Sequence, residues 1–316
     1  MSPHRRIYAG FGARSRRIAT CAVQACVLLA VCAILALAGA SQAHACSRAQ
    51  MAFVHPDGIT PTNPAVEEIV AALRRGLGLE IDVCSASALS ARASTPALLG
   101  AFPLGPEATA TVTARFPDAR LIPLLVASLP LGTTQGVSVF VSPDTVIDQV
   151  CSVAPNIKQL KLVHRPDVPG YFFEHLRKAA ARCGITVDTT SVDTLADAAQ
   201  AVERFLRDPG PHAVWFHRGV INLNDDILIP NIVRLSWSQS IPVIAEEADY
   251  VKRGILIGFF HDYGSVARSA VELWRGTGTG LAYSADPKRV INRRTAGAIG
   301  IQIKPSQEGL YDYVYQ

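Results

Sequence analysis

The chain has 316 residues. A single hydrophobic core usually organises fewer residues than this, so the length predicts two lobes. Its 30 lysine and arginine residues exceed its 26 acidic residues, but five of the arginines lie within residues 1–45, where no acidic residue occurs. Outside that segment 25 basic residues face 26 acidic ones, so no excess of positive charge remains to hold a phosphate backbone, and nucleic-acid binding is not expected.

Residues 1–45 have the pattern of an export signal. Arginines near the start are followed by an apolar run, Ile18–Ala40, and then by Ala43-His44-Ala45. A basic start, an apolar middle and an A-x-A site are typical of a secretory signal peptide, which predicts a periplasmic protein. The apolar run is also long enough to span a bilayer, so an uncleaved anchor stays open as an alternative. Cys46 stands where a lipoprotein carries its lipid, although Ala43 and His44 fit a lipobox poorly.

The exported part opens with a predicted βαβ unit. Met51–His55 is a short apolar strand, and Asn63 caps a helix that has Pro64 at its first position. Gly78 ends that helix, and Leu79–Val83 resumes as a strand. Because a right-handed crossover joins parallel neighbours, the two strands are expected to lie parallel in one sheet.

The rest of the first lobe is short. Ala97–Phe102 and Leu121–Val126 are expected strands, with a weak helix from Pro106 towards Phe116 between them. The lobe therefore contains few strands and is predicted to be trimmed. Gly132–Gly136 is rich in glycine and threonine, and we expect it to carry the chain into the second lobe.

Short apolar strands and amphipathic helices then alternate to the end of the chain. The predicted strands are residues 137–142, 160–163, 186–192, 213–216, 241–244 and 255–260, and the predicted helices are residues 143–151, 171–182, 195–206 and 232–237 together with one that begins after Asp262. This alternation predicts an α/β protein with two lobes, each built on a doubly wound parallel sheet.

Four cysteines follow the export signal, namely Cys46, Cys84, Cys151 and Cys183. In an oxidising compartment they permit two disulfides, and three pairings are formally allowed. Cys151 and Cys183 each close a predicted helix just before a strand, so both are expected at the same edge of the sheet. We therefore favour the pair Cys151–Cys183.

Candidate ligand-binding residues follow from the topology, because open parallel sheets bind ligands beyond the carboxyl ends of their strands. The residues just past those ends include His55, Phe102, Ser128, His164, Arg165, His217, Arg218, Glu246 and Asp262, and Tyr250 and Tyr263 of the stretch Ser240–Gly264 complete the candidate set. His261 lies at another such end, so four of the six histidines after residue 45 are strand-end residues. A metal site is therefore an alternative, but no H-x-x-x-H or C-x-x-C spacing supports it.

Motifs for catalysis are absent from the sequence. It contains no G-x-S-x-G, no phosphate-binding G-x-x-x-x-G-K-[ST] and no G-x-G-x-x-G after a strand. Gly276–Gly280 is rich in glycine but follows a helix, and adjacent Glu246 and Glu247 point to opposite faces of an extended stretch. The sequence therefore predicts a binding protein without a cofactor rather than an enzyme.

The second half of the chain, from about Gly136 to Pro305, contains a series of short motifs in a specific order. They are Gly136-Val-Ser138, Ala154–Val163, Ile241–Ile244, Val251–Gly254, Asp262-Tyr263, Val290–Asn292, Ala296 and Gly300-Ile301. In this order they resemble the periplasmic substrate-binding proteins of ABC transporters, specifically the family that includes tryptophan-binding members.

This resemblance implies a type 1 periplasmic binding fold, in which two lobes close on a small ligand that is delivered to a membrane permease. It implies a first lobe of residues 46–136 plus about 262–282, and a second lobe of residues 137–261 plus about 283–316. We expect a monomer. A periplasmic sensor or accessory protein with the same fold is the alternative.

The first half departs from the family pattern. Gly100-Ala-Phe-Pro103 stands where a Gly-Thr-Pro turn is usual, and Leu129-Pro130 stands where an Asp-Pro is usual. Val168-Pro-Gly170 replaces a polar pair. Because these changes remove expected amino-acid contacts, the resemblance does not carry amino-acid specificity to this chain.

Overall fold

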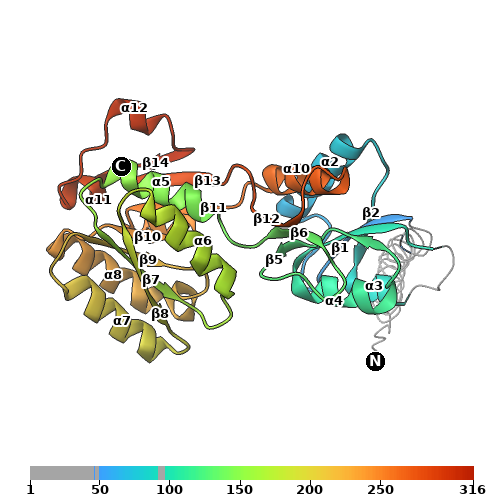
Figure 1. Cartoon of the computed structure of the whole chain (residues 1–316), viewed down its shortest axis with the longest axis horizontal. Helices are drawn as coiled ribbons and strands as arrows, with labels where there is room; N and C mark the ends of the chain where they lie inside the picture. Colours follow the sequence, from blue (N-terminus) through green and yellow to red (C-terminus); the bar gives the residue numbers. More distant parts are fainter. Residues whose placement is uncertain (1–45, 47–49, 92–96) are drawn as a thin grey trace, which may run out of the picture.

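The computed structural model describes residue 46 and residues 50–91 and 97–316. The predicted signal peptide, residues 1–45, lies outside the described residues. Within them, no helix is both long and apolar enough to cross a membrane. Two lobes lie side by side along the long axis of the molecule and are joined by thin connections (Figure 1).

The first lobe is built on a parallel sheet with the order β2-β1-β3-β4. Its strands are β1 (Met51–His55), β2 (Asp82–Ser85), β3 (Gly100–Pro103) and β4 (Arg120–Leu121). Helix α2 (Pro64–Leu77) covers one face, and α3 (Ala86–Ser90) and α4 (Gly105–Arg115) cover the other (Figure 1).

Helix α2 forms as its sequence predicts. The Asn63 side chain accepts a hydrogen bond from the Ala65 N–H at 2.9 Å, and Gly78 ends the helix with a φ of 67°. Its buried face packs with Phe53 of β1 in one apolar cluster.

A second, three-stranded sheet with the order β12-β6-β5 lies at the inner end of the first lobe. It contains β5 (Leu124–Val126), β6 (Gln135–Ser138) and β12 (Gly280–Ala282). The single strand predicted over Leu121–Val126 is wrong, because β4 and β5 belong to different sheets. Pro123 lies at the break, and a proline has no N–H to donate to a continuous ladder.

The second lobe is built on a seven-stranded sheet with the order β14-β13-β11-β10-β9-β7-β8. Its strands are β7 (Gln159–His164), β8 (Thr186–Ser191), β9 (His212–Phe216), β10 (Val243–Ala245), β11 (Ile257–Phe260), β13 (Lys288–Asn292) and β14 (Tyr313–Tyr315). The sheet is mixed rather than wholly parallel, because β13 runs antiparallel to β11. An antiparallel edge on an otherwise parallel sheet is common in doubly wound folds.

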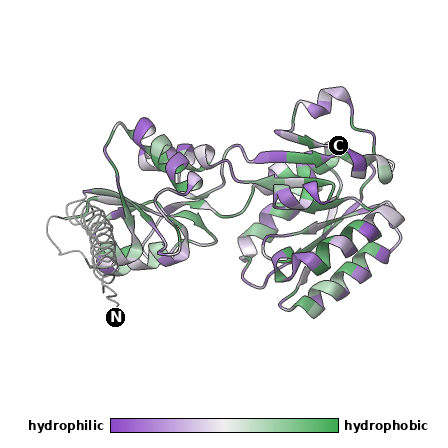
Figure 2. Cartoon of the chain, turned by 180° about the vertical axis from the view of Figure 1, so that it is seen from behind, coloured by the Kyte–Doolittle hydropathy of each residue, from purple (hydrophilic) through white to green (hydrophobic). Residues whose placement is uncertain are grey.

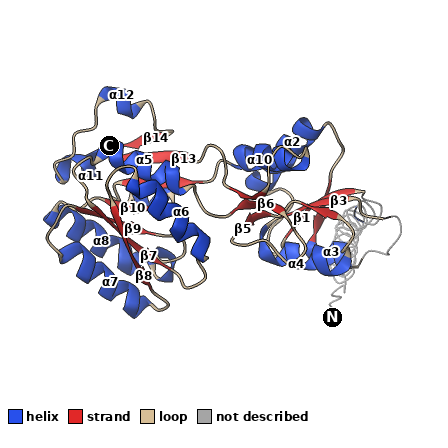
Figure 3. Cartoon of the chain, in the orientation of Figure 1, coloured by secondary structure: helices blue, strands red, loops and turns tan. Residues whose placement is uncertain are grey.

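Helices cover both faces of this sheet (Figure 3). α5 (Pro143–Val153) and α6 (Gly170–Ala181) pack on one face, and α7 (Leu195–Arg207) and α8 (Asp225–Gln239) pack on the other. The short elements are η1 (Ile221–Leu223), α9 (Ala248–Lys252), α11 (Arg293–Ala298) and α12 (Pro305–Glu308). Figure 2 shows apolar residues along the central strands and an alternation of apolar and polar residues on the helices, as layered packing requires.

The described chain passes between the lobes after β6, after β11 and after β12 (Figure 1). Val137 belongs to the core of the first lobe and Phe140 to the core of the second, so the first crossing lies between them. It is therefore later than the predicted crossing at Gly132–Gly136. Helix α10 (Tyr263–Trp274) returns to the first lobe and packs against α2.

Two disulfides connect the cysteines of the described chain. Cys151 is bonded to Cys183, which is the pair favoured from the sequence, with a Cα–Cα distance of 6.4 Å. Cys46 is bonded to Cys84 with a Cα–Cα distance of 5.7 Å. The sulfur of Cys46 is therefore occupied, which leaves it unavailable for a lipid.

Candidate functional site

A cavity of about 800 Å³ lies between the two lobes. The first lobe contributes the connection after β1, the starts of α2 and α4, and the β5–β6 connection, while the second contributes the connections after β7 and β9. Most of these segments follow the carboxyl ends of strands, where open parallel sheets bind ligands. The volume falls within the range of small-molecule sites.

The wall of this cavity is mainly apolar. Ile59, Val66 and Ile69 line it from the first lobe, and Phe140 and Val168 line it from the second. An apolar wall with a few placed polar groups is the usual composition of a ligand site. The polar groups therefore decide which ligands fit.

Two arginines of the second lobe line the cavity. Arg165 is engaged, because its guanidinium lies 2.9 Å from a carboxylate oxygen of Asp193 and donates to the Asp193 carbonyl at 2.5 Å. Arg218 is exposed and has no ion-pair partner among the described residues. Arg218 is thus the cation that is free to meet a ligand, whereas exposed Asp167 supplies a carboxylate to the same wall.

The first lobe adds the beginning of α4 to the cavity wall. No side chain caps this helix, and its first residue, Gly105, has a φ of 75°. The Thr109 hydroxyl is engaged within the helix, donating to the Gly105 carbonyl at 2.6 Å. Unsatisfied N–H groups and the helix dipole give such a start a partial positive charge. This helix start therefore adds to the charge of Arg218 on the opposite wall, and the exposed Glu107 of the same first turn offsets part of that addition.

The structure brings some of the predicted site residues to this cavity and leaves others elsewhere. Ser128, Arg165, Arg218 and Tyr263 line it. His217, Glu246 and Tyr250 line a chamber of about 10 Å³ in the second lobe, and Arg218 belongs to the walls of both spaces. Seven of the eleven predicted residues thus line the cavity or its adjoining chamber.

The chamber contains a buried histidine and a buried carboxyl group. The side chains of His217 and Glu246 are 0% and 6% exposed, and His217 Nε2 lies 3.4 Å from Glu246 Oε1. Burial, aided by the charges of His164 and Arg218, lowers the pKa of His217 to about 3. Burial raises the pKa of Glu246 to about 8, against the opposing effect of Arg218. At neutral pH a neutral imidazole therefore faces a protonated carboxyl group.

Tyr250 supports the outer part of this chamber. Its hydroxyl donates a hydrogen bond to Asn222 Oδ1, which ties the start of α9 to η1. Burial raises the pKa of Tyr250 to about 12, so the phenol stays protonated as a donor.

The remaining predicted residues lie outside both spaces. Phe102 is fully buried in the core, with its ring centroid 5.3 Å from that of Trp274, so its prediction as a ligand contact is wrong. It belongs to β3, whose residues are all buried, rather than to the connection that follows. Asp262 accepts from the Ser265 N–H at 3.0 Å and lies 3.2 Å from the Arg268 guanidinium, so it caps α10 at the hinge.

Two of the predicted histidines are engaged with neighbouring backbone. His55 Nδ1 donates to the Pro56 carbonyl at 2.9 Å, and His164 Nδ1 donates to the Arg165 carbonyl at 2.8 Å. Both side chains are buried near strand ends but do not line the cavity. They support the strand ends rather than reach a ligand.

The histidines do not form a metal site in the described part of the chain. No group of three histidine, cysteine, aspartate or glutamate residues there could hold an ion. His261 Nε2 instead donates to the Val139 carbonyl at 2.9 Å, which connects two of the crossings between the lobes. The alternative of a metal-binding protein thus has no geometric support among these residues.

Reasoning from strand ends missed the helix starts that line the cavity. Asn63 and Gly105 are wall residues, and each is followed by a proline at the beginning of a helix. The connections after β1 and β3 both end in such helix starts at the carboxyl edge of the first sheet. The Asn-Pro and Gly-Pro pairs were therefore a usable signal for the wall.

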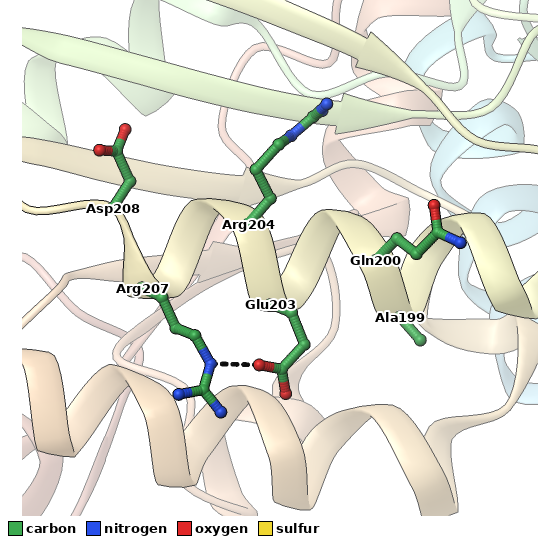
Figure 4. Close-up of a pocket in the computed structure, with 6 residues that line it drawn as sticks. All are labelled: Ala199, Gln200, Glu203, Arg204, Arg207 and Asp208. Atoms are coloured by element: carbon green, nitrogen blue, oxygen red, sulfur yellow. Dashed lines mark hydrogen bonds and ion pairs between the residues drawn. The ribbon is translucent and has the colours of Figure 1, made fainter.

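A second hollow, of about 730 Å³, lies on the outer surface of α7 (Figure 4). Its wall residues all belong to this helix or follow it directly, and they are Ala199, Gln200, Glu203, Arg204, Arg207 and Asp208. Figure 4 shows their side chains spreading away from one helix, with Glu203 and Arg207 paired to each other. They do not converge on a point, so the interlobe cavity is the better candidate.

No protein-family profile and no curated protein sequence matches the chain. Among solved structures, it is similar to CD0873, a substrate binding protein with adhesive properties from Clostridium difficile, in a ligand-free, open form. The identity is 17%, the TM-score is 0.62, and the match covers 84% of this chain and 99% of that one.

Two further structures have the same arrangement. An ABC domain from Streptococcus pneumonia in complex with L-Trp is 18% identical with a TM-score of 0.56, over 85% of this chain and 100% of that one. A conserved domain protein from Vibrio cholerae is 15% identical with a TM-score of 0.54, over 84% of this chain and 100% of that one. At these identities the likeness shows the fold, and the chain has the type 1 periplasmic binding fold of ABC-type substrate-binding proteins.

Proposed function

We propose that this protein is an exported solute-binding protein of an ABC-type uptake system. The observation that carries the proposal is the cavity of about 800 Å³, which has walls from both lobes and lies beside the crossings that join them. A ligand that contacts both walls stabilises the closed arrangement of the lobes, so binding energy is converted into a change of hinge angle. A permease can then distinguish the loaded protein from the empty one.

The relatives in fold support a binding role rather than catalysis. One is described as bound to L-Trp, and another as a substrate binding protein. We propose by extension that this chain is a monomer that binds a small molecule, works with a membrane permease, and neither catalyses a reaction nor binds nucleic acid.

The composition of the cavity suggests the class of ligand. Arg218 and the uncapped start of α4 attract negative charge, while side chains such as Ile69 and Phe140 favour an apolar body. We propose a small anion with an apolar portion, such as an organic carboxylate.

The compartment is also a proposal. The pattern of residues 1–45 favours export through a signal peptide, and the disulfides favour an oxidising environment. Because Cys46 is bonded to Cys84, we propose a soluble periplasmic form rather than one with a lipid on Cys46. Mass spectrometry of the exported protein would detect the Cys46–Cys84 peptide pair, whereas a lipid-modified Cys46 would contradict this proposal.

The test is a thermal-shift screen of residues 46–316 against organic carboxylates, amino acids, nucleosides and metal ions. A ligand at 100 times its Kd adds about 2.7 kcal/mol of stability, which is readily detected. A hit with wild type that is lost in Arg218→Gln supports the cavity as the site. If no compound shifts the melting temperature, the proposed transport function loses its basis. If a ligand binds but its uptake is unchanged in cells lacking the protein, the sensor role is favoured instead.

A further inference from the structure

A chamber of about 10 Å³ lies at the carboxyl ends of β9 and β10, separate from the main cavity. Arg218 and Gly219 belong to the walls of both spaces, so they divide the chamber from the cavity. His217 and Glu246 form its buried end. The volume is close to that needed by one water molecule.

The polar atoms at this buried end have no hydrogen-bond partner among the described residues. They are His217 Nδ1, His217 Nε2 and Glu246 Oε1. The separation of 3.4 Å between His217 Nε2 and Glu246 Oε1 is longer than an ordinary hydrogen bond. Because unsatisfied buried polar groups are costly and rare, these atoms indicate that a hydrogen-bonding partner lies in the chamber beside the pair, where one water can reach both side chains.

The surroundings of the pair are largely apolar. The rings of Phe172 and Phe140 pack against His217, with centroids 4.8 Å and 5.2 Å from its own. Trp215 belongs to β9, which His217 directly follows, and its ring centroid lies 5.4 Å from that of His217. Its indole N–H and the backbone N–H of Arg218 act on Glu246 as hydrogen-bond donors and partly favour the ionised form. A carboxylate buried beside these rings would lack the solvation that it has in water.

Few charged or titratable groups act on the pair from the neighbouring elements. His164 at the end of β7 and Arg218 after β9 act on His217, and Arg218 and Glu247 act on Glu246. Tyr250 of α9 is engaged with Asn222 of η1. Arg218 is therefore the group whose positive charge opposes retention of a proton by the pair.

We propose that His217 and Glu246 form a proton-binding site that holds one shared proton and one bridging water, and that the charge of Arg218 sets how tightly this proton is held. Without the proton, a carboxylate would be buried beside a neutral imidazole. With it, the pair is either two neutral groups or an internal ion pair, and both states avoid an uncompensated buried charge. The depressed pKa of His217 and the raised pKa of Glu246 agree with this assignment.

The position of Arg218 couples this proton to the main cavity. Its guanidinium favours the ionised form of Glu246. An anion bound to Arg218 from the cavity side weakens that effect, so the pair binds its proton more tightly. By reciprocity, the bound proton strengthens the binding of the anion. This consequence rests on the proposed function, whereas the proton site itself does not.

The test follows the carboxyl carbon of Glu246 by NMR in protein carrying carbon-13-labelled glutamate, from about pH 3.5 to about pH 10. Glu246→Gln assigns the signal by removing it. We expect Glu246 to remain protonated at neutral pH in wild type. In Arg218→Gln we expect its titration to move to higher pH, corresponding to about threefold to tenfold tighter proton binding.

Arg165→Gln is the matched control, because Arg165 also lines the cavity but is paired with Asp193 and is not among the groups that act on Glu246. It should leave the titration unchanged. Titration of Glu246 near pH 4.5 in wild type would overturn the proton site, and equal shifts in both arginine variants would overturn the role of Arg218. Because no ligand is needed, these results are independent of whether the transport function is correct.

Discussion

Replacement of Glu246 by glutamine should change how the stability of the protein depends on pH. In the folded protein the pKa of Glu246 is raised to about 8, whereas its ordinary value is 4.5. A group with a raised folded pKa contributes stability below its unfolded pKa, and that contribution is lost as the pH rises through the folded pKa. Between about pH 6 and about pH 8, the free energy of unfolding of the wild type should therefore fall by about 2 kcal/mol more than that of Glu246→Gln.

The sign of this effect does not depend on which atom holds the proton. In this window the folded pair retains one proton, either on Glu246 or on His217, while an unfolded glutamate has lost its own. Urea denaturation at several pH values measures the difference between wild type and variant, which cancels the pH dependence of all other groups. Glu174→Gln is the matched control, because Glu174 is an exposed glutamate of the same lobe and is not among the groups that act on Glu246. Parallel stability curves for wild type and Glu246→Gln would refute the reasoning.

Three further predictions concern the cavity, the core and the disulfide. Arg218→Gln should weaken a carboxylate ligand found in the screen about tenfold, measured by calorimetry, and unchanged affinity would remove Arg218 from the site. Phe102→Ala should lower the free energy of unfolding, measured by urea denaturation, by about 3 to 5 kcal/mol, because the ring is fully buried. A variant that keeps its stability but loses ligand binding would instead show that Phe102 is a ligand contact. Replacing Cys151 and Cys183 by serine should lower the free energy of unfolding by about 3 kcal/mol under non-reducing conditions. Equal stability of the variant and the wild type would show that this disulfide does not stabilise the protein.

The second lobe was the more predictable from sequence because its signals are local. Thr194 and Asp197 form the capping box at the start of α7, and the buried strand His212–Phe216 reads as a continuous apolar run. Each of these patterns involves residues within a few positions of each other. Such local patterns located β7 to β11 and α5 to α8, and their alternation gave the fold class, although α8 begins at Asp225, earlier than the predicted residues 232–237. The later elements β13, β14, α11 and α12 were not predicted.

The first lobe was less predictable because its sheet partners are set by distant contacts. The run Leu121–Val126 is apolar, and although Pro123 marks a break in it, the run does not show that the two pieces belong to different sheets. The separation depends on Gln135–Ser138, which pairs with Leu124–Val126, and on Gly280–Ala282, which pairs on the other side. Leu125 has a φ of 54° within this irregular pairing. Local propensity contains no information on such partners.

The candidate site was partly predictable for the same reason. The rule that ligands bind beyond strand ends identified Arg165 and Arg218, because both follow strands whose ends are clear in the sequence. It misplaced Phe102, because the rule takes the last residue of a strand to point outwards, and side chains within a strand alternate between faces. The lobe boundaries beyond the first crossing stay a prediction.

The location of the polar groups in the second lobe has a consequence for how the site can work. His217 and Glu246 directly follow the adjacent strands β9 and β10 and are nearly inaccessible to solvent, whereas Arg218 is exposed. A ligand in the cavity therefore meets Arg218 directly and the buried pair only through it. If the buried pair were a direct contact, Glu246→Gln would weaken binding at every pH. If it acts through Arg218, the variant should remove the pH dependence of binding while leaving the affinity near pH 6 nearly unchanged, because the wild-type pair is protonated there.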